Sequence, residues 1–85
     1  MRVIKGKKGC EHSWQDDFPT VVSCEAGCGG IGHIAFVAIE EQGEKDGYIY
    51  ENKPENVKLW PHDAIAVAVY ICEKCMKTTS LMNQG

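Results

Sequence analysis

The sequence has few aromatic residues and no long apolar segment. Two Phe, two Trp and three Tyr are too few among 85 residues to build a large apolar core. No run approaches the roughly 18 consecutive apolar residues that indicate a membrane-spanning helix. The basic start, residues 1–9, has no hydrophobic stretch behind it and does not read as a secretory signal. A membrane protein and a secreted protein are therefore disfavoured, and we expect a small cytoplasmic domain.

Charge is unevenly distributed along the chain. Four of the nine basic residues lie in the first eight positions, at Arg2, Lys5, Lys7 and Lys8. Residues 10–85 hold the other five and all twelve acidic residues, a net charge of −7. Because an acidic body repels phosphate, a dedicated nucleic-acid binder is disfavoured, although the basic start can contact RNA or DNA weakly. Chain ends are commonly solvated, so we expect residues 1–9 to form a flexible basic tail.

Five cysteines carry most of the functional signal. They fall into short pairs: C-x3-C at Cys24 and Cys28, C-x2-C at Cys72 and Cys75, and Cys10 with the nearby His12. An odd number of cysteines without an export signal argues against a disulfide framework. Each pair can place two donor atoms on one tight turn, which is how tetrahedral zinc is held.

The residues after each cysteine pair differ. Gly29 follows Cys28 and can adopt a positive φ, which lets backbone N–H groups point at a thiolate sulfur. Met76 occupies the equivalent position after Cys75 and is less suited to that conformation. We therefore expect the second turn to be less regular than the first.

Two cysteine pairs separated by strand-like sequence resemble a zinc ribbon. In addition, Cys10-Glu-His12-Ser-Trp14 is similar to the C-x-H-x-W opening of small zinc-ribbon proteins of bacteria and their phages. The resemblance implies a small antiparallel sheet stapled by zinc. The chain departs from the pattern in two ways. The gap of 43 residues between the pairs exceeds the roughly 15–20 of a compact module, and the first pair has three residues inside it rather than two.

The candidate ligands outnumber the four that a structural zinc takes. They are Cys24, Cys28, Cys72, Cys75, Cys10 and His12. The simplest arrangement is one site made by the C-x3-C and C-x2-C pairs. A site made by Cys10, His12 and one later pair is the next alternative. Two sites are possible if His33 and His62 take part, and iron in a rubredoxin-like centre or no metal at all remain open.

Alternating apolar residues predict β-structure around the cysteine pairs. Residues 64–71 alternate strictly and are rich in β-branched side chains, which predicts a strand that delivers Cys72 at its end. Further strands are predicted at 34–41, 20–23, 78–82 and, as a returning strand, 48–50. A turn is predicted at 43–47 and at most one helical turn at 54–59. The predicted fold is a small, mainly β, antiparallel sheet stapled by metal, one zinc-binding domain over residues 10–85.

Some residues allow a catalytic interpretation. His33 adjoins an apolar run, so a half-buried strand histidine is favoured over a ligand. His62 and Asp63 would suit acid–base chemistry, but adjacent strand residues face opposite sides and a plain loop is favoured. A redox C-x-x-C pair sits at a helix N-terminus, whereas Cys72 follows a predicted strand. The chain has no H-x-E pairing of the kind that zinc deaminases use.

Three classes of function follow, in decreasing order of preference. The first is a non-catalytic, zinc-stabilised adaptor or regulator that binds another protein, such as a component of the transcription or nucleic-acid machinery. The second is a zinc ribbon that binds nucleic acid directly through the basic N-terminal arm. The third is an enzyme, either a dithiol oxidoreductase or a metal hydrolase.

Overall fold

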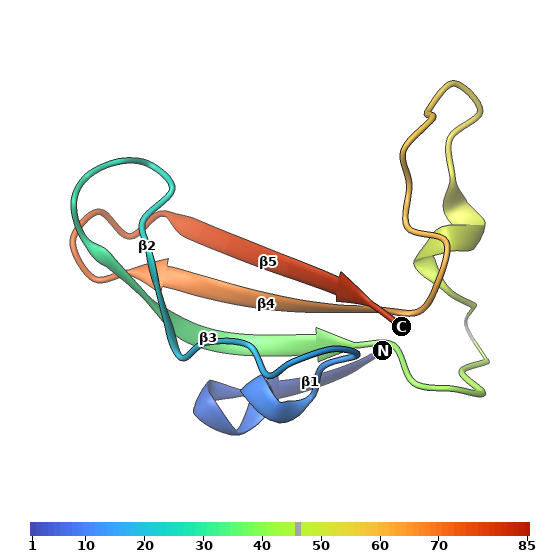
Figure 1. Ribbon diagram of the computed structural model, residues 1–85, viewed down its shortest axis with the longest axis horizontal. Coiled ribbons are helices and arrows are strands. Elements are labelled where there is room, and N and C mark those ends of the chain that lie inside the picture. Colours follow the sequence, from blue (N-terminus) through green and yellow to red (C-terminus); the bar gives the residue numbers. More distant parts are fainter. Residues whose placement is uncertain (46) are drawn as a thin grey trace.

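The computed structural model describes residues 1–45 and 47–85, and these residues are mostly antiparallel β-sheet (Figure 1). The strands of this part of the chain are β1 (Arg2–Lys5), β2 (Val21–Ser23), β3 (Ile31–Ile39), β4 (Ile65–Cys72) and β5 (Thr78–Gln84). Its helices are short 3₁₀ turns, η1 (Gly6–Glu11) and η2 (Ile49–Asn52). The small, mainly β fold predicted from the sequence is confirmed.

The sheet has the strand order β1-β3-β4-β5, with β2 pairing the first half of β3. All pairings are antiparallel, and the register joins Ile4, Val37, Ala68 and Leu81 in one row across the sheet. The register shifts between Ile34 and Phe36, which marks a bulge in β3. Both chain ends lie at one end of the sheet, and the β4–β5 turn and β2 lie at the other (Figure 1).

One face of the sheet carries the core. Val37, Ala66, Ala68 and Tyr70 on β3 and β4 are fully buried. They are covered by η1 and the segment that follows it, from which Cys10, Trp14 and Phe18 pack against the sheet. The Tyr70 hydroxyl donates a hydrogen bond to the Pro19 carbonyl oxygen at 2.7 Å, which holds this segment in place. The core therefore lies between one face of the sheet and the non-strand part of the chain that covers it.

The N-terminal residues form an edge strand, so the expectation of a flexible tail over residues 1–9 is wrong. β1 pairs with the second half of β3, from Arg2 opposite Ile39 to Lys5 opposite Phe36. Ile4 packs against the core, and Gly9 and Cys10 of η1 are buried. The strand forms because it satisfies the backbone of β3, a pairing partner that lies more than 30 residues away in the sequence.

Residues 40–64 form a long excursion between β3 and β4, which rises beside one end of the sheet in Figure 1. The strand predicted at 48–50 is wrong, because Ile49–Asn52 forms η2 instead. The turn predicted at 43–47 has a positive φ at Gly43 and Gly47, and Asp46 lies outside the described residues. The single turn predicted after Pro54 is closed by a hydrogen bond from the Val57 N–H to the Pro54 carbonyl.

One side chain ties the excursion to the sheet, and a second holds the excursion together. The carboxylate of Glu40 is 1% exposed and accepts hydrogen bonds from the backbone N–H of Ile49 at 3.0 Å and of Ile65 at 3.2 Å. The Trp60 indole donates to the Ile49 carbonyl at 3.0 Å. In the part of the chain that the structure describes, no helix has the length and apolar character needed to cross a membrane.

Candidate metal centre

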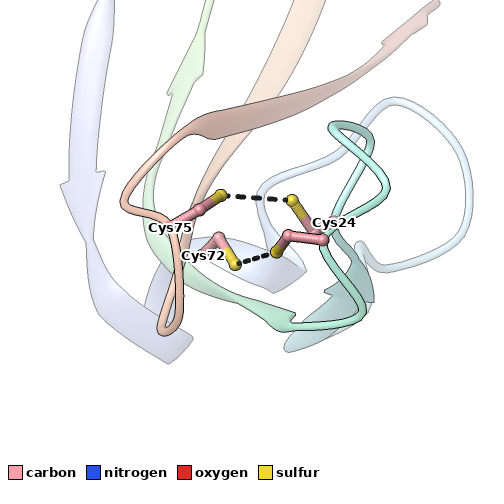
Figure 2. A group of neighbouring side chains, drawn as sticks. Cys24, Cys72 and Cys75 are labelled. Atoms are coloured by element: carbon pink, nitrogen blue, oxygen red, sulfur yellow. Dashed lines mark hydrogen bonds between the residues drawn. The ribbon is translucent and has the colours of Figure 1, made fainter.

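Four cysteines meet where two loops come together at one end of the sheet. Cys24 and Cys28 lie in the loop between β2 and β3, Cys72 ends β4, and Cys75 lies in the β4–β5 turn. Figure 2 shows the thiols of Cys24, Cys72 and Cys75 pointing toward one another from these loops. The Sγ atoms of all four cysteines lie within 4.8 Å of one another. Long-range strand pairing thus closes the gap of 43 residues between the two pairs.

The sulfur separations fit a shared metal ion. The Sγ atoms of Cys24 and Cys75 are 3.6 Å apart, and those of Cys28 and Cys72 are 3.5 Å apart. A disulfide would place two sulfurs about 2.05 Å apart, and all the cysteines of this chain are free. A tetrahedral metal with bonds of about 2.3 Å separates its sulfur ligands by about 3.8 Å. The group can therefore hold a metal ion with little rearrangement.

Backbone N–H groups support one sulfur from each pair. The Gly30 N–H donates to the Cys28 Sγ and the Lys74 N–H donates to the Cys72 Sγ, both at 3.4 Å. In each case the donor lies two residues after the cysteine that it supports. Such N–H···S bonds stabilise thiolates and orient metal ligands. The donors were not identified from the sequence, although the Gly29-Gly30 pair was the signal that could have indicated one of them.

The two turns are more alike than the sequence predicts. Gly29 has a φ of +78°, which confirms the positive φ expected after Cys28. Met76 has a φ of +66° at the equivalent position after Cys75, a conformation that non-glycine residues seldom adopt. The turn is closed by a hydrogen bond from the Cys72 N–H to the Lys77 carbonyl at 2.9 Å. The expected irregularity is therefore absent from this turn, and Met76 takes a strained backbone instead.

The thiols of Cys28 and Cys72 differ in acidity. The Gly30 N–H lowers the pKa of Cys28, but hydrogen bonds with the neighbouring thiols, Cys72 foremost, together with desolvation raise it overall to about 12. Backbone N–H groups of Cys75 and Lys74 lower the pKa of Cys72 to about 6. The backbone N–H groups therefore favour the thiolate at Cys72, which can offer a first ligand, whereas a metal must displace the proton of Cys28 to bind there.

The other two candidate ligands lie outside this group. Cys10 is 5% exposed in the core, and its Sγ donates to the Pro19 carbonyl at 3.6 Å. Burial, and secondarily the charge of Asp17, raises the pKa of this thiol, which disfavours the thiolate that metal binding requires. His12 follows η1 and has its Nε2 3.9 Å from a carboxylate oxygen of Glu11. Cys10 and His12 are therefore close in sequence because both belong to the part of the chain that covers the core, and they do not join the four-cysteine group.

The two remaining histidines of interest are also apart from the four cysteines. His33 lies on β3, with its Nε2 2.8 Å from a carboxylate oxygen of Glu73. His62 lies in the excursion at the opposite end of the sheet, with 79% of its side chain exposed and its Nε2 3.6 Å from a carboxylate oxygen of Asp63. Neither belongs to the metal-ligating groups found among the described residues.

Comparison with known proteins identifies no relative of this chain, so its site is interpreted from its geometry. Searches with this chain found no matching family model, no matching curated protein and no matching solved structure. The chain is a small antiparallel β fold with a four-cysteine group that can hold a metal ion.

Proposed function

We propose that Cys24, Cys28, Cys72 and Cys75 hold a structural zinc ion, as in a zinc ribbon. Four sulfur donors in mutual reach match the closed tetrahedral sites that stabilise small folds. A closed set leaves no position for a substrate or an activated water, so a structural role is favoured over catalysis. Zinc would also join the β2–β3 loop to the β4–β5 turn at one end of the sheet.

We further propose that the domain is a non-catalytic cytoplasmic adaptor that binds another protein. The observation that carries this proposal is the second face of the sheet, which we call the open face. All five strands contribute apolar side chains to it, and the polar residues Lys5, His33, Thr78 and Ser80 share the face. The apolar residues are Val3, Val21, Phe36, Ala38, Val67, Val69, Ile71 and Met82. The register aligns Val3, Ala38, Val67 and Met82 in one row.

Four of the eight apolar side chains on the open face are exposed, and the other four are half-buried. The exposed fractions are 58% for Val3, 47% for Val21, 40% for Ile71 and 51% for Met82. Four strands about 4.8 Å apart and five residues of about 3.3 Å each give a flat area of roughly 300 Å². The largest apolar patch on a typical monomer covers about 300–600 Å² and is often functional, so a patch of this size supports an interaction site. A component of the transcription or nucleic-acid machinery is the partner class that we favour.

Site-specific photo-crosslinking in the cells that make this protein tests the proposal. A photoreactive residue at Ile71 reports on the open face, and one at the exposed Glu55 of the excursion is the matched control. We expect Ile71 to yield one discrete adduct heavier than two copies of the chain, and Glu55 to yield none. Equal crosslinking at both positions, or none at Ile71, would contradict the proposal.

Direct nucleic-acid binding is the second candidate function. Lys5, Lys7 and Lys8 are exposed at the edge formed by β1 and η1, where four basic residues fall within eight positions. Because this segment is fixed to the sheet, it presents a defined basic edge rather than a flexible arm. Charge reversal of all three lysines should abolish DNA retention and its salt dependence if this function operates. Retention unchanged by the reversal would exclude it.

A further inference from the structure

The two outer edges of the sheet differ in how they are protected from pairing. β1 is short, with only four residues, and has a charged residue at each end, Arg2 and Lys5. β5 spans seven residues, Thr78–Gln84, and contains no charged residue and no proline. Natural edge strands avoid association by charge, proline, bulges or short length. β5 has none of these protections, so its edge is open to another strand.

The register identifies the β5 residues whose backbone faces outward. The Cys72 N–H bonds to the Lys77 carbonyl, and the Gly85 N–H bonds to the Ala64 carbonyl. Residues hydrogen-bond to β4 at every second position between these two bonds, which assigns Thr79, Leu81 and Asn83 to the β4 side. The residues between them, Thr78, Ser80, Met82 and Gln84, direct their N–H and C=O groups to the free edge.

Three of the four outward residues have unused backbone groups. The Gln84 carbonyl accepts a hydrogen bond from the Gln15 side chain at 3.1 Å, which closes that end of the edge. Among residues 1–45 and 47–85, no hydrogen-bond partner is found for the outward backbone groups of Thr78, Ser80 and Met82. This leaves three N–H and three C=O groups in a row, with Ser80 at the centre.

We propose that two copies of this chain pair through β5 to form a symmetric dimer. An antiparallel pairing centred on Ser80 places Ser80 opposite Ser80 of the second copy and Thr78 opposite its Met82. Each such pair of residues can exchange two backbone hydrogen bonds, so about six would form. The same three residues are used on both sides, as a two-fold interface requires. The uncharged sequence of β5 puts no like charges in opposition.

The same register covers two of the most exposed apolar side chains. Met76 is 74% exposed and Leu59 is 90% exposed. Leu59 lines a groove with Met82 and Gln84 at the end of β5. The pairing centred on Ser80 brings the β4–β5 turn of the second copy, which carries Met76, toward the Gln84 end of β5, where Leu59 lies. The dimer also joins the two sheets edge to edge, so that the two open faces become continuous.

The mass of the full-length, metal-loaded chain in solution tests the dimer. Sedimentation equilibrium should give twice the chain mass of 9.4 kDa. Ser80→Lys places two lysines opposite each other, and Ser80→Glu does the same with two glutamates, so each variant alone should dimerise about fivefold more weakly. An equimolar mixture of the two variants should recover the dimer, because lysine then faces glutamate. Val3→Lys, on the opposite edge strand, should leave the dimer intact.

The charge-pair design separates association from folding. Each variant should keep the metal content and the circular dichroism of the parent chain, because Ser80 is exposed and directs no backbone group to β4. The proposal would be overturned if the chain stayed monomeric up to about 100 µM. It would also be overturned by a dimer that neither variant weakens. Failure of the mixture to recover the dimer would overturn the pairing centred on Ser80. None of these readouts depends on whether another protein binds the open face.

Discussion

Gly30 lies so close to Cys72 that a Cβ atom at this position would be 2.6 Å from the Cys72 Sγ. The same Cβ would be 2.8 Å from the Cβ of Lys74 and 3.2 Å from the Sγ of Cys28. The two loops therefore approach each other through a residue without a side chain. This contact fixes how far apart the two cysteine pairs can be, and it links the Gly29-Gly30 sequence directly to the geometry of the metal centre.

Gly30→Ala should weaken metal binding. The added methyl group forces the two loops apart, and we expect metal affinity to fall at least tenfold in competition with a chromophoric chelator. Gly29→Ala is the matched control, because Gly29 has a φ of +78° but a Cβ there meets nothing within 4 Å. The control should cost about 1–2 kcal/mol of stability from backbone strain and keep the metal. Equal metal affinity in the two variants would contradict the steric argument.

Removal of a ligand should unfold the domain. Cys72→Ser and Cys28→Ser each leave three sulfur ligands, and a structural zinc contributes on the order of ten kcal/mol to folding. Native mass spectrometry of the parent should show one zinc per chain, and both variants should lose it together with cooperative folding. Cys10→Ala and His12→Asn are the controls and should retain one zinc. Loss of the metal from either control would return Cys10 or His12 to the ligand set.

The features that the sequence predicts well are local ones. β4 has a strict alternation of β-branched residues, so its pattern indicates a strand without reference to the rest of the chain. The cysteine pairs are visible because the two ligands of each pair sit on one turn. Their joint site is the simplest of the arrangements that the sequence allows, since the predicted strands lie next to the cysteines.

The features that the sequence misses depend on distant contacts. β1 has only four residues, and its stability comes from pairing with β3 rather than from its own pattern. Tyr48-Ile-Tyr50 has strand propensity, but buried Glu40 binds the Ile49 N–H and favours a 3₁₀ turn. Cys10 and His12 resemble a ligand pair in spacing, and only the packing of Cys10 under the covering segment distinguishes a core thiol from a ligand.

Met76→Gly should stabilise the domain. Met76 has a φ of +66°, and a non-glycine residue in this conformation costs about 1–2 kcal/mol. Glycine removes that strain but loses about 0.5–1 kcal/mol of backbone entropy, which leaves a net gain of about 0.5–1 kcal/mol. Denaturant unfolding of the metal-loaded protein in the Ser80→Lys background measures this without a contribution from association. A loss of stability would mean that the Met76 side chain makes a contact worth more than the strain.

Deletion of residues 1–5 should destabilise the domain, in contrast to the behaviour of a flexible tail. The deletion unpairs half of β3 and removes Ile4 from the core. Ile4→Ala alone should cost about 1–2 kcal/mol, below the usual range for fully buried positions because Ile4 is half-buried. Arg2→Ala is the control, because its ion pair with Glu41 is exposed and should contribute less than about 0.5 kcal/mol. Equal unfolding midpoints for the deletion and the parent would mean that β1 contributes nothing.

Glu40→Ala should loosen the excursion and lower the stability of the whole domain. The substitution leaves the N–H groups of Ile49 and Ile65 without their acceptors, and each buried unsatisfied group costs about 1–3 kcal/mol. Glu40→Gln keeps one acceptor oxygen, so about half of that loss should return. Amide hydrogen exchange followed by NMR resolves the two sites. Protection at Ile49 and Ile65 should fall together in Glu40→Ala. Glu40→Gln should keep protection at one of them, because each N–H group now bonds to a different carboxylate oxygen and glutamine keeps only one.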